Sequence, residues 1–291
     1  MSMRFEKYFQ PKSVEECQSL LKEYGKDARL LAGGTDVVPR IKMKMWQPKA
    51  VIGLMDVKGL DEITVSDKGL TLGALANLRE ISLSPALEAE YKVVKEACGH
   101  VSSMQVRNMA TIGGNACNAS PSADAIHGLL LHDAAVVIAG ADGTREMPLC
   151  DFFKGPGKTD LGEAEMVVRF EIAKPGAHTG ASYKKYAIRG DSDISIVGAG
   201  ARLTLKDDGT VAEARLTLAS VAPTPLRCRE AEALLVGKKP DEALIREAAE
   251  ACAAKATPIS DPRATKEYRL EMVRVWIRHA LEEALSRAQA N

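Results

Sequence analysis

The chain has 291 residues, with 39 lysines and arginines balanced by 39 aspartates and glutamates, so its formal net charge is zero. Its 46% apolar and 27% charged residues can build a packed core, which excludes disorder as the main state, and the length suggests about two domains or one domain with sub-lobes. A neutral chain lacks the basic surface that binds nucleic acid or anionic membranes, and no apolar run is long enough for a membrane span. Residues 1–11 show no secretory signal, so we expect a cytoplasmic protein with no nucleic-acid partner and no membrane span.

The six cysteines are scattered along the chain, with no Cys-x-x-Cys pair and no tight cluster (Cys17, Cys98, Cys117, Cys150, Cys228 and Cys252). Zinc and iron–sulfur sites need several thiolates close together, usually at short spacings. A disulfide framework is equally unexpected in a chain of this size. The sequence therefore predicts free thiols and no metal site in this chain.

Residues 1–58 have the pattern of a first α/β lobe. Ser13 followed by Glu16 forms a capping box before a helix with one apolar face, and Gly25 supplies its C-terminal stop. The next apolar strand ends at a pair of glycines. The expected order is helix, strand, glycine turn, short helix and strand, over residues 14–24, 28–32, 33–34, 35–44 and 51–54.

Residues 59–176 are predicted to form a second lobe. It opens with a hairpin whose turn is Asp67-Lys68-Gly69, and Asn77 with Glu80 caps a short helix. Residues 108–124 are polar and rich in glycine and lack an apolar period, so we expect a long loop there. The other expected elements are strands at 62–65, 70–73, 134–139 and 166–172 and helices at 86–98 and 125–131.

Residues 177–291 are predicted to form a third lobe, which follows a connector at residues 173–179. Strands come first and helices with apolar faces follow, so we expect the helices to pack against the strands. The expected strands are 182–187, 194–205 and 211–220, and the expected helices are 229–236, 241–254 and 264–288.

Two double-glycine segments are the strongest chemical signal: Ala32-Gly33-Gly34-Thr35-Asp36 and Thr111-Ile112-Gly113-Gly114-Asn115. Glycine permits positive φ and lacks Cβ, so successive backbone N–H groups can converge on one anion. Neither segment contains Lys or Arg, so a diphosphate held there would rest on backbone dipoles and short polar side chains such as Thr35. The alternative is that both segments are ordinary tight turns at strand ends.

Four signatures point to one family. They are Leu31 to Asp36, Ala110 to Asn115 continued by Ala119-Ser120-Pro121 as far as Asp124, Tyr183-x-Lys185 with Arg189, and Ala219 to Pro225. In these residues the chain resembles the FAD-binding (medium) subunit of the molybdenum hydroxylases, the xanthine dehydrogenase and carbon monoxide dehydrogenase group. The resemblance runs from near Phe5 to the final helix.

The resemblance implies an α+β fold of the vanillyl-alcohol-oxidase-like (PCMH-type) FAD-binding kind, with two α/β lobes and a C-terminal strand-plus-helix lobe. Non-covalent FAD would lie between the first two lobes, with its diphosphate on both glycine segments. Asp124, otherwise a plain helix cap, would meet the ribose or adenosine end, and Lys185 would approach the isoalloxazine edge. Val101 and Val167 would wall the ring and adenine pockets. The expected cofactor-binding residues are Leu31, Ala32, Gly33, Gly34, Thr35, Asp36, Val101, Ala110, Thr111, Gly113, Gly114, Asn115, Ala123, Asp124, Val167 and Lys185.

The same resemblance implies partners and a function. The chain would be the FAD-carrying electron-transfer subunit of a multi-subunit molybdenum hydroxylase, either a heterotrimer or a dimer of heterotrimers. A small subunit would carry [2Fe–2S] centres and a large subunit the molybdenum cofactor, and electrons would leave through FAD to NAD or another acceptor. No catalytic acid or base is expected in this chain. Two alternatives remain open: a stand-alone FAD-dependent oxidoreductase, and a nucleotide-binding assembly module without redox turnover.

Overall fold

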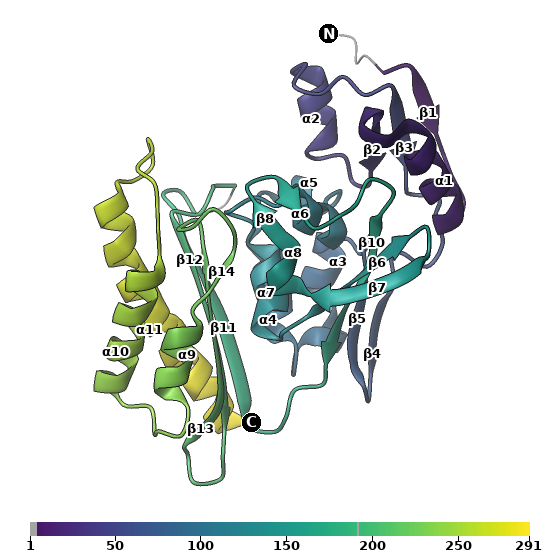
Figure 1. Cartoon of the computed structure of the whole chain (residues 1–291). Helices are drawn as coiled ribbons and strands as arrows, with labels where there is room; N and C mark the ends of the chain where they lie inside the picture. Colours follow the sequence, from purple (N-terminus) through teal and green to yellow (C-terminus); the bar gives the residue numbers. More distant parts are fainter. Residues whose placement is uncertain (1–4, 191) are drawn as a thin grey trace.

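The computed structural model describes residues 5–190 and 192–291 and arranges them around three main sheets that follow one another along the chain (Figure 1). We call residues 5–58 the first lobe, 59–176 the second lobe, and 177–190 with 192–291 the third lobe. Figure 1 shows the first lobe at the upper right, the second in the middle and the third at the left. This mixture of helices and sheets confirms the predicted α+β class. No helix in the described ranges is long and apolar enough to cross a membrane.

The first lobe is a parallel three-stranded sheet of order β1-β3-β2. Helix α1 begins at Ser13, whose hydroxyl accepts the Glu16 N–H at 3.3 Å, and ends at Gly25 with φ 48°. Its buried face packs Cys17 and Leu21 into one apolar cluster with the strands. The elements are β1 (Lys7–Phe9), α1 (Val14–Tyr24), η1 (Gly25–Asp27), β2 (Ala28–Leu31), α2 (Val37–Lys42) and β3 (Ala50–Gly53). The predicted elements are confirmed, and β1 is an addition to them.

The second lobe is built on a five-stranded antiparallel sheet of order β4-β5-β10-β6-β7. Its strands are β4 (Ile63–Ser66), β5 (Gly69–Gly73), β6 (Ala135–Gly140), β7 (Gly143–Pro148), β8 (Phe153–Gly155), β9 (Lys158–Thr159) and β10 (Met166–Ala173). Its helices are α3 (Leu78–Leu83), η2 (Pro85–Leu87), α4 (Lys92–Gly99), α5 (Met104–Arg107), α6 (Ile112–Asn118), α7 (Ala125–Leu131) and α8 (Leu149–Phe152). Helices α4 and α7 lie between this sheet and the third lobe (Figure 1).

Two predictions for the second lobe are wrong. The helix expected over 86–98 is broken, because η2 ends at Leu87 and α4 begins only at Lys92. The stretch 108–124 is not a loop throughout, because α6 occupies its centre. Thr111 caps α6, and Ala119 with φ 46° ends it. A helix of this length buries too few residues to show an apolar period, so the sequence pattern did not reveal it.

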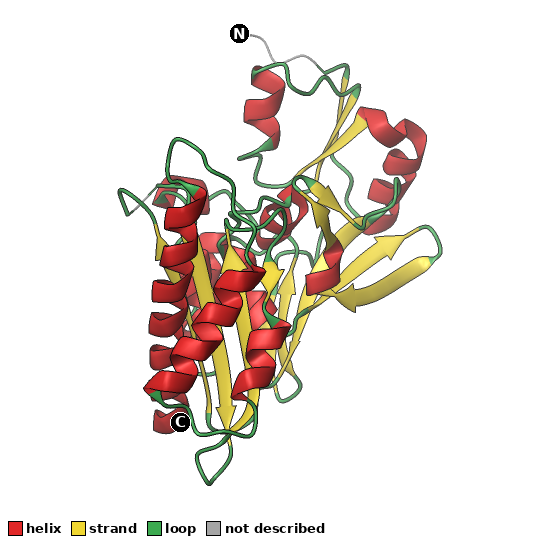
Figure 2. Ribbon diagram, turned by 60° about the vertical axis from the view of Figure 1, so that its left-hand side comes forward, coloured by secondary structure: helices red, strands yellow, loops and turns green. Residues whose placement is uncertain are grey.

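The third lobe is an antiparallel sheet of order β11-β12-β13-β14 followed by three helices. The elements are β11 (Thr179–Tyr186), β12 (Val197–Leu205), β13 (Val211–Ala219), β14 (Leu226–Arg227), α9 (Arg229–Leu235), α10 (Glu242–Lys255) and α11 (Lys266–Ala290). The three helices cover one face of the sheet, as predicted (Figure 2). The sheet also contacts α4 and α7 of the second lobe, so β11 lies at the boundary between the second and third lobes.

Candidate cofactor site

The two glycine segments meet where the first lobe rests on the second. A Cβ on Gly33 would lie 1.6 Å from the carbonyl oxygen of Met109 and 3.1 Å from the Ala110 nitrogen, so the two backbones are in direct contact. Gly34 follows with φ +72°, in the turn that leads from β2 into α2. Both positions therefore require glycine, one for space and the other for its backbone angle.

The second segment has a different backbone. Gly113 and Gly114 lie in the first turn of α6, and neither has a positive φ. A Cβ on Gly113 would lie 2.5 Å from the Ala74 carbonyl oxygen, so this glycine allows α6 to pack closely on the chain after β5. The alternative of an ordinary tight turn at a strand end is therefore wrong for Gly113-Gly114.

The first segment supplies a run of unpaired backbone N–H groups. Among the described residues, the N–H groups of residues 33–36 have no protein acceptor. In contrast, the Gly113 N–H donates to the Ala74 carbonyl at 2.8 Å, and the Gly114 N–H donates to Thr111 Oγ1 at 3.0 Å. The prediction that both glycine pairs aim their amides at one anion is wrong for the second pair, because its amides are already bonded.

A cavity of ≈ 600 Å³ opens beside these segments, with walls from all three lobes. The expected residues that line it are Ala32, Gly33, Gly34, Thr35, Asp36, Val101, Ala110, Thr111, Gly113, Gly114, Asn115, Ala123, Asp124, Val167 and Lys185. Leu31 is not among the lining residues, and its Cδ1 would lie 3.2 Å from a Cβ on Gly34. The cavity thus brings together residues from three of the four signatures, those at Leu31 to Asp36, at Ala110 to Asp124 and at Lys185.

The wall of the cavity contains a buried ion pair. Lys185 Nζ lies 2.8 Å from Asp124 Oδ2, and the two side chains are only 5% and 6% exposed. The ammonium also donates to the carbonyl of His100 at 2.8 Å, which places it beside Val101. Two of its three N–H groups are therefore committed to protein acceptors, and the third is available to the cavity.

The Asp124 carboxylate takes two further protein donors. Tyr183 Oη donates to Asp124 Oδ1 at 2.8 Å and Ser195 Oγ donates to the same oxygen at 2.6 Å. Burial, with the Asp124 charge, raises the pKa of Tyr183, so its phenol stays protonated and donates. Because Asp124 and Lys185 form one ion pair, they cannot lie at opposite ends of an extended FAD, which corrects that expectation.

The first lobe adds a stacked group that the sequence analysis missed. The guanidinium groups of Arg29 and Arg40 lie 5.0 Å and 4.6 Å from the Trp46 ring centroid, and all three residues line the cavity. Arg40 also donates to Asn118 Oδ1 at 2.6 Å, which ties α2 to α6. Arg40 also lies 3.9 Å from Asp36, at an i,i+4 spacing that the sequence contained, so a cation lies beside a segment that itself contains neither Lys nor Arg.

The cavity also has apolar lining residues. Leu54, Leu75, Met166 and Val167 are buried side chains that line it together with Leu161. They come from the end of β3, the chain after β5, and the region before and within β10. Of these residues only Val167 belonged to the expected set, because burial in a core and burial beside a ligand leave the same apolar signal in a sequence.

Comparison with known proteins assigns the chain to a family. Residues 3–175 match the family described as the FAD binding domain in molybdopterin dehydrogenase, and residues 181–284 match the CO dehydrogenase flavoprotein C-terminal domain. The chain belongs to the FAD-binding subunits of the molybdenum hydroxylases. This FAD-binding subunit is therefore an oxidoreductase component, the medium subunit of multi-subunit enzymes that also contain small and large subunits.

The similarity covers nearly the whole FAD-binding subunit. It is 30% identical to the xanthine dehydrogenase FAD-binding subunit of Escherichia coli O157:H7, over 98% of this chain and 97% of that protein. It is 32% identical to the carbon monoxide dehydrogenase medium chain of Afipia carboxidovorans, over 97% of each chain. A solved structure of carbon monoxide dehydrogenase from Hydrogenophaga pseudoflava matches with a TM-score of 0.94 and 33% identity, covering 99% of both chains. The predicted family and fold are confirmed.

The residues of the cavity fit a dinucleotide cofactor. Residues 33–36 line the cavity, and their four successive amides have no acceptor among the described residues, so they are available to an anion. Asn115 Oδ1 is buried without a partner among the described residues, and buried acceptors of this kind normally bond to something. All six cysteines are free thiols, and no group of three His, Cys, Asp or Glu side chains in residues 5–190 and 192–291 could hold a metal ion.

Proposed function

We propose that the cavity holds FAD non-covalently, with its diphosphate on the amides of residues 33–36 and its isoalloxazine ring at the Lys185 end. The observation that carries this proposal is the run of unpaired amides beside a cavity with a buried ammonium in its wall. When bound, FAD supplies the redox chemistry, exchanging electrons between one-electron and two-electron carriers. The protein residues bind and orient it.

Both lobes contribute donors for the diphosphate. The amides of residues 33–36 and the Thr35 hydroxyl come from the first lobe, and the Thr111 hydroxyl comes from the second. Arg40 adds positive charge from α2. Burial raises the pKa of Asp36 while Arg40 opposes the shift, and a carboxylate repels a diphosphate, so we assign Asp36 to hydroxyl groups of the ribose or ribityl chain.

Lys185 and Val101 support the ring. The third N–H of the Lys185 ammonium would donate to the polar edge of the isoalloxazine, and Val101 would offer an apolar flank. Because Asp124 neutralises Lys185, the pair adds a strong donor without a net charge. Asp124 itself acts as a positioning residue that holds the ammonium in place, with three protein donors around its carboxylate.

The apolar part of the cavity suits adenine. Leu54, Leu75, Leu161, Met166 and Val167 offer flat apolar contact and little competition for hydrogen bonds. Small residues elsewhere leave room for the cofactor to approach the backbone, namely Ala32, Gly33, Gly34, Ala110, Gly113, Gly114 and Ala123.

We infer the wider assembly from the relatives. A small partner subunit would carry [2Fe–2S] centres and a large partner the molybdenum cofactor, with NAD or another acceptor taking the electrons. We place the complex in the cytoplasm and draw the lobe boundaries at 58/59 and 176/177, where one sheet ends and the next begins. Purification of this chain from its native host, followed by analysis for iron and molybdenum, tests the assembly. A yellow protein that co-purifies with neither metal would overturn it.

Two neighbouring lysines provide a matched test of the ring assignment. Lys185 points into the cavity, whereas Lys184 pairs with Glu283 of α11 on the other face of β11. Lys185→Met should raise the dissociation constant for FAD by about tenfold to a hundredfold, since a hydrogen bond from a charged group contributes about 1.5–3 kcal/mol. Lys184→Met should leave it unchanged. Titration of the apoproteins with FAD measures both, and equal affinities in the two variants would overturn the assignment.

A further inference from the structure

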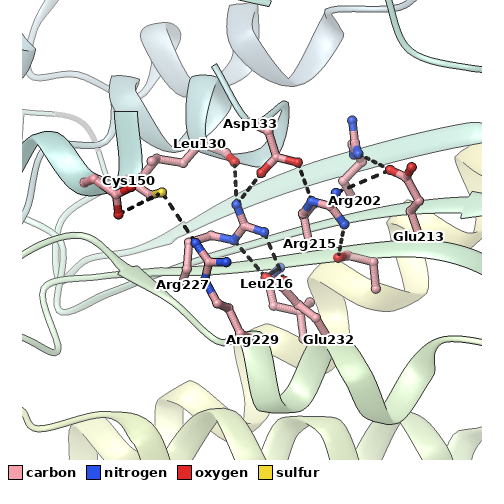
Figure 3. A network of polar contacts seen from close by, with 12 residues as sticks. Leu130, Asp133, Cys150, Arg202, Glu213, Arg215, Leu216, Arg227, Arg229 and Glu232 are labelled. Carbon is pink, nitrogen blue, oxygen red and sulfur yellow. Dashed lines mark hydrogen bonds and ion pairs between the residues drawn. The ribbon is translucent and has the colours of Figure 1, made fainter. Parts of the chain in front are cut away.

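Helix α7 is held at both ends by the third lobe. All seven of its residues are buried, and a Cβ on Gly200 of β12 would lie 3.0 Å from its Leu131, so helix and sheet are in direct contact. Asp124 at its start binds Lys185 of β11. Asp133, just beyond its end, binds basic residues of β13 and β14 (Figure 3). One carboxylate at each end of a rigid helix therefore fixes the third lobe against the second.

The Asp133 end is a compact network in an interlobe groove. Asp133 Oδ2 accepts from Arg215 Nε at 2.5 Å, and Asp133 Oδ1 accepts from Arg227 Nη1 at 2.5 Å (Figure 3). Arg227 also pairs with Glu232, its Nε 2.8 Å from Oε1, and its side chain is only 9% exposed. The same groove has a volume of ≈ 890 Å³ and separates β6 and β7 from β13, β14 and α9.

The charges of this network are strongly committed. Burial pulls the pKa of Asp133 upward, but the hydrogen bonds and charges of Arg227 and Arg215 outweigh burial and hold it below its ordinary value. Asp133 also has φ 51°, a left-handed backbone that Asp and Asn adopt more readily than most residues. A residue in this conformation with both carboxylate oxygens bonded across a lobe boundary is poorly placed for substitution by any residue except Asn.

We propose that Asp133, with Arg215 and Arg227, is a remote positioning clamp for Lys185. The clamp lies at the opposite end of α7 from the cavity and lines no part of it. It fixes the rotation of the third-lobe sheet about the Leu131–Gly200 contact, and β11 of that sheet carries Lys185. Loss of the clamp moves the ammonium at the other end of the helix without removing any group that touches FAD. This inference rests on the proposed placement of the ring beside Lys185.

Asp133→Asn is the primary test, because asparagine keeps the volume and the left-handed backbone and removes the charge. The lobes should stay docked, since Arg287 of α11 still pairs with Glu96 of α4, their Nη2 and Oε1 atoms 2.7 Å apart. We expect FAD to bind about tenfold more weakly to this variant. Glu250→Gln, which removes an Arg–carboxylate pair with Arg274 inside the third lobe, is the matched control and should change nothing.

A double-mutant cycle separates positioning from general destabilisation. If Asp133 acts through Lys185, Asp133→Asn should weaken FAD binding less than about twofold in the Lys185→Met background. Arg215→Gln, which removes one arm of the clamp, should reproduce the single-variant loss and guards against a folding failure of Asp133→Asn. Additive effects, or no effect of either clamp variant, would overturn the clamp while leaving the ring assignment intact. A Lys185→Met variant that binds FAD normally would instead overturn the proposed function, and the clamp with it.

Discussion

The two cavity walls that carry glycine pairs differ in the backbone conformation of the pair and in the hydrogen bonding of its amides. In the first lobe, Gly34 has φ +72° and the amides of residues 33–36 are unpaired among the described residues. In the second lobe, Gly113-Gly114 is helical and its amides are bonded to protein acceptors. The first wall therefore offers backbone N–H donors. The glycine amides of the second wall are already bonded within the protein, so that wall can offer side-chain donors such as the Thr111 hydroxyl. A double glycine in a sequence therefore has two physical meanings, and only an account of the backbone hydrogen bonds separates them.

Gly33→Ala should have the largest effect, because it disrupts the contact between the two walls. The new Cβ would lie 1.6 Å from the Met109 carbonyl oxygen, so the two lobes must move apart. We expect the purified variant to contain no FAD and to bind none at concentrations that saturate the unaltered protein, as measured by visible absorbance. Gly176→Ala is the control, because a Cβ there meets nothing within 4 Å. Stoichiometric FAD in Gly33→Ala would contradict the contact between the walls.

Acid should have the next largest effect and should act on the second lobe, because residues 59–176 contain His100, His127 and His132 and the first lobe contains no histidine. Burial lowers the pKa of His127 to about 3, and burial with the Arg202 charge lowers that of His132 to about 3, from an ordinary value of 6.5. Both rings are neutral in the folded state, so their contribution to stability is present above pH 6.5 and is lost as the pH falls toward 3. Near pH 5 the loss should reach about 2 kcal/mol per histidine, or about 4 kcal/mol in all.

Urea unfolding near neutral pH and near pH 5 measures this loss. In the double variant His127→Phe with His132→Phe the pH-dependent loss should shrink by about 4 kcal/mol. Phenylalanine is chosen because the His127 ring stacks on Tyr183, with centroids 5.3 Å apart and planes at 12°. An equal loss in the variant and the parent would show that other groups make the second lobe acid-sensitive.

Gly113→Ala sharpens the comparison by testing packing without touching a donor. Its Cβ would lie 2.5 Å from the Ala74 carbonyl oxygen, and overpacking of this kind costs about 1–3 kcal/mol. We expect a lower free energy of unfolding in urea together with weakened, not abolished, FAD binding. Loss of FAD with unchanged stability would mean that the Gly113 amide serves the cofactor after all.

Gly34 should give the smallest effect, and a choice of two substitutions identifies its cause. A Cβ there meets only side-chain atoms, Leu31 Cδ1 at 3.2 Å and Val38 Cγ2 at 3.3 Å, so the backbone angle matters more than space. Gly34→Ala should cost about 1–2 kcal/mol of turn stability and weaken FAD binding accordingly. Gly34→Asn should cost less, because asparagine tolerates the left-handed region. Equal affinities for FAD in the two variants would exclude the backbone angle as the reason for glycine.

Local sequence signals predicted most elements of the fold. Ser13 and Gly25 mark the ends of α1, Asn77 marks the start of α3, and the third-lobe helices follow their apolar spacing. Helix α6 was not predicted, because the residues it buries are few and two of its seven positions are glycine. Strand β7 was not predicted, because most of its side chains are exposed and its sequence lacks alternating apolar residues.

The candidate site was predictable as a set of residues but not as an arrangement. Of the residues that the resemblance implied, all except Leu31 line the cavity. It could not supply the ion pair of Lys185 with Asp124, because their separation along the chain carries no information about distance in space. Nor could it supply Arg40, whose position depends on how α2 lies against α6. Pairings between lobes are set by tertiary packing, which no local pattern encodes.

A crystal structure of the protein with FAD is the most direct test of the central claim, that unpaired amides of the first wall hold the diphosphate. The account predicts phosphate oxygens within about 3.2 Å of backbone nitrogens in residues 33–36, with the Gly113 amide still bonded to Ala74. A diphosphate bound to the Gly113 and Gly114 amides, with residues 33–36 facing solvent, would contradict it.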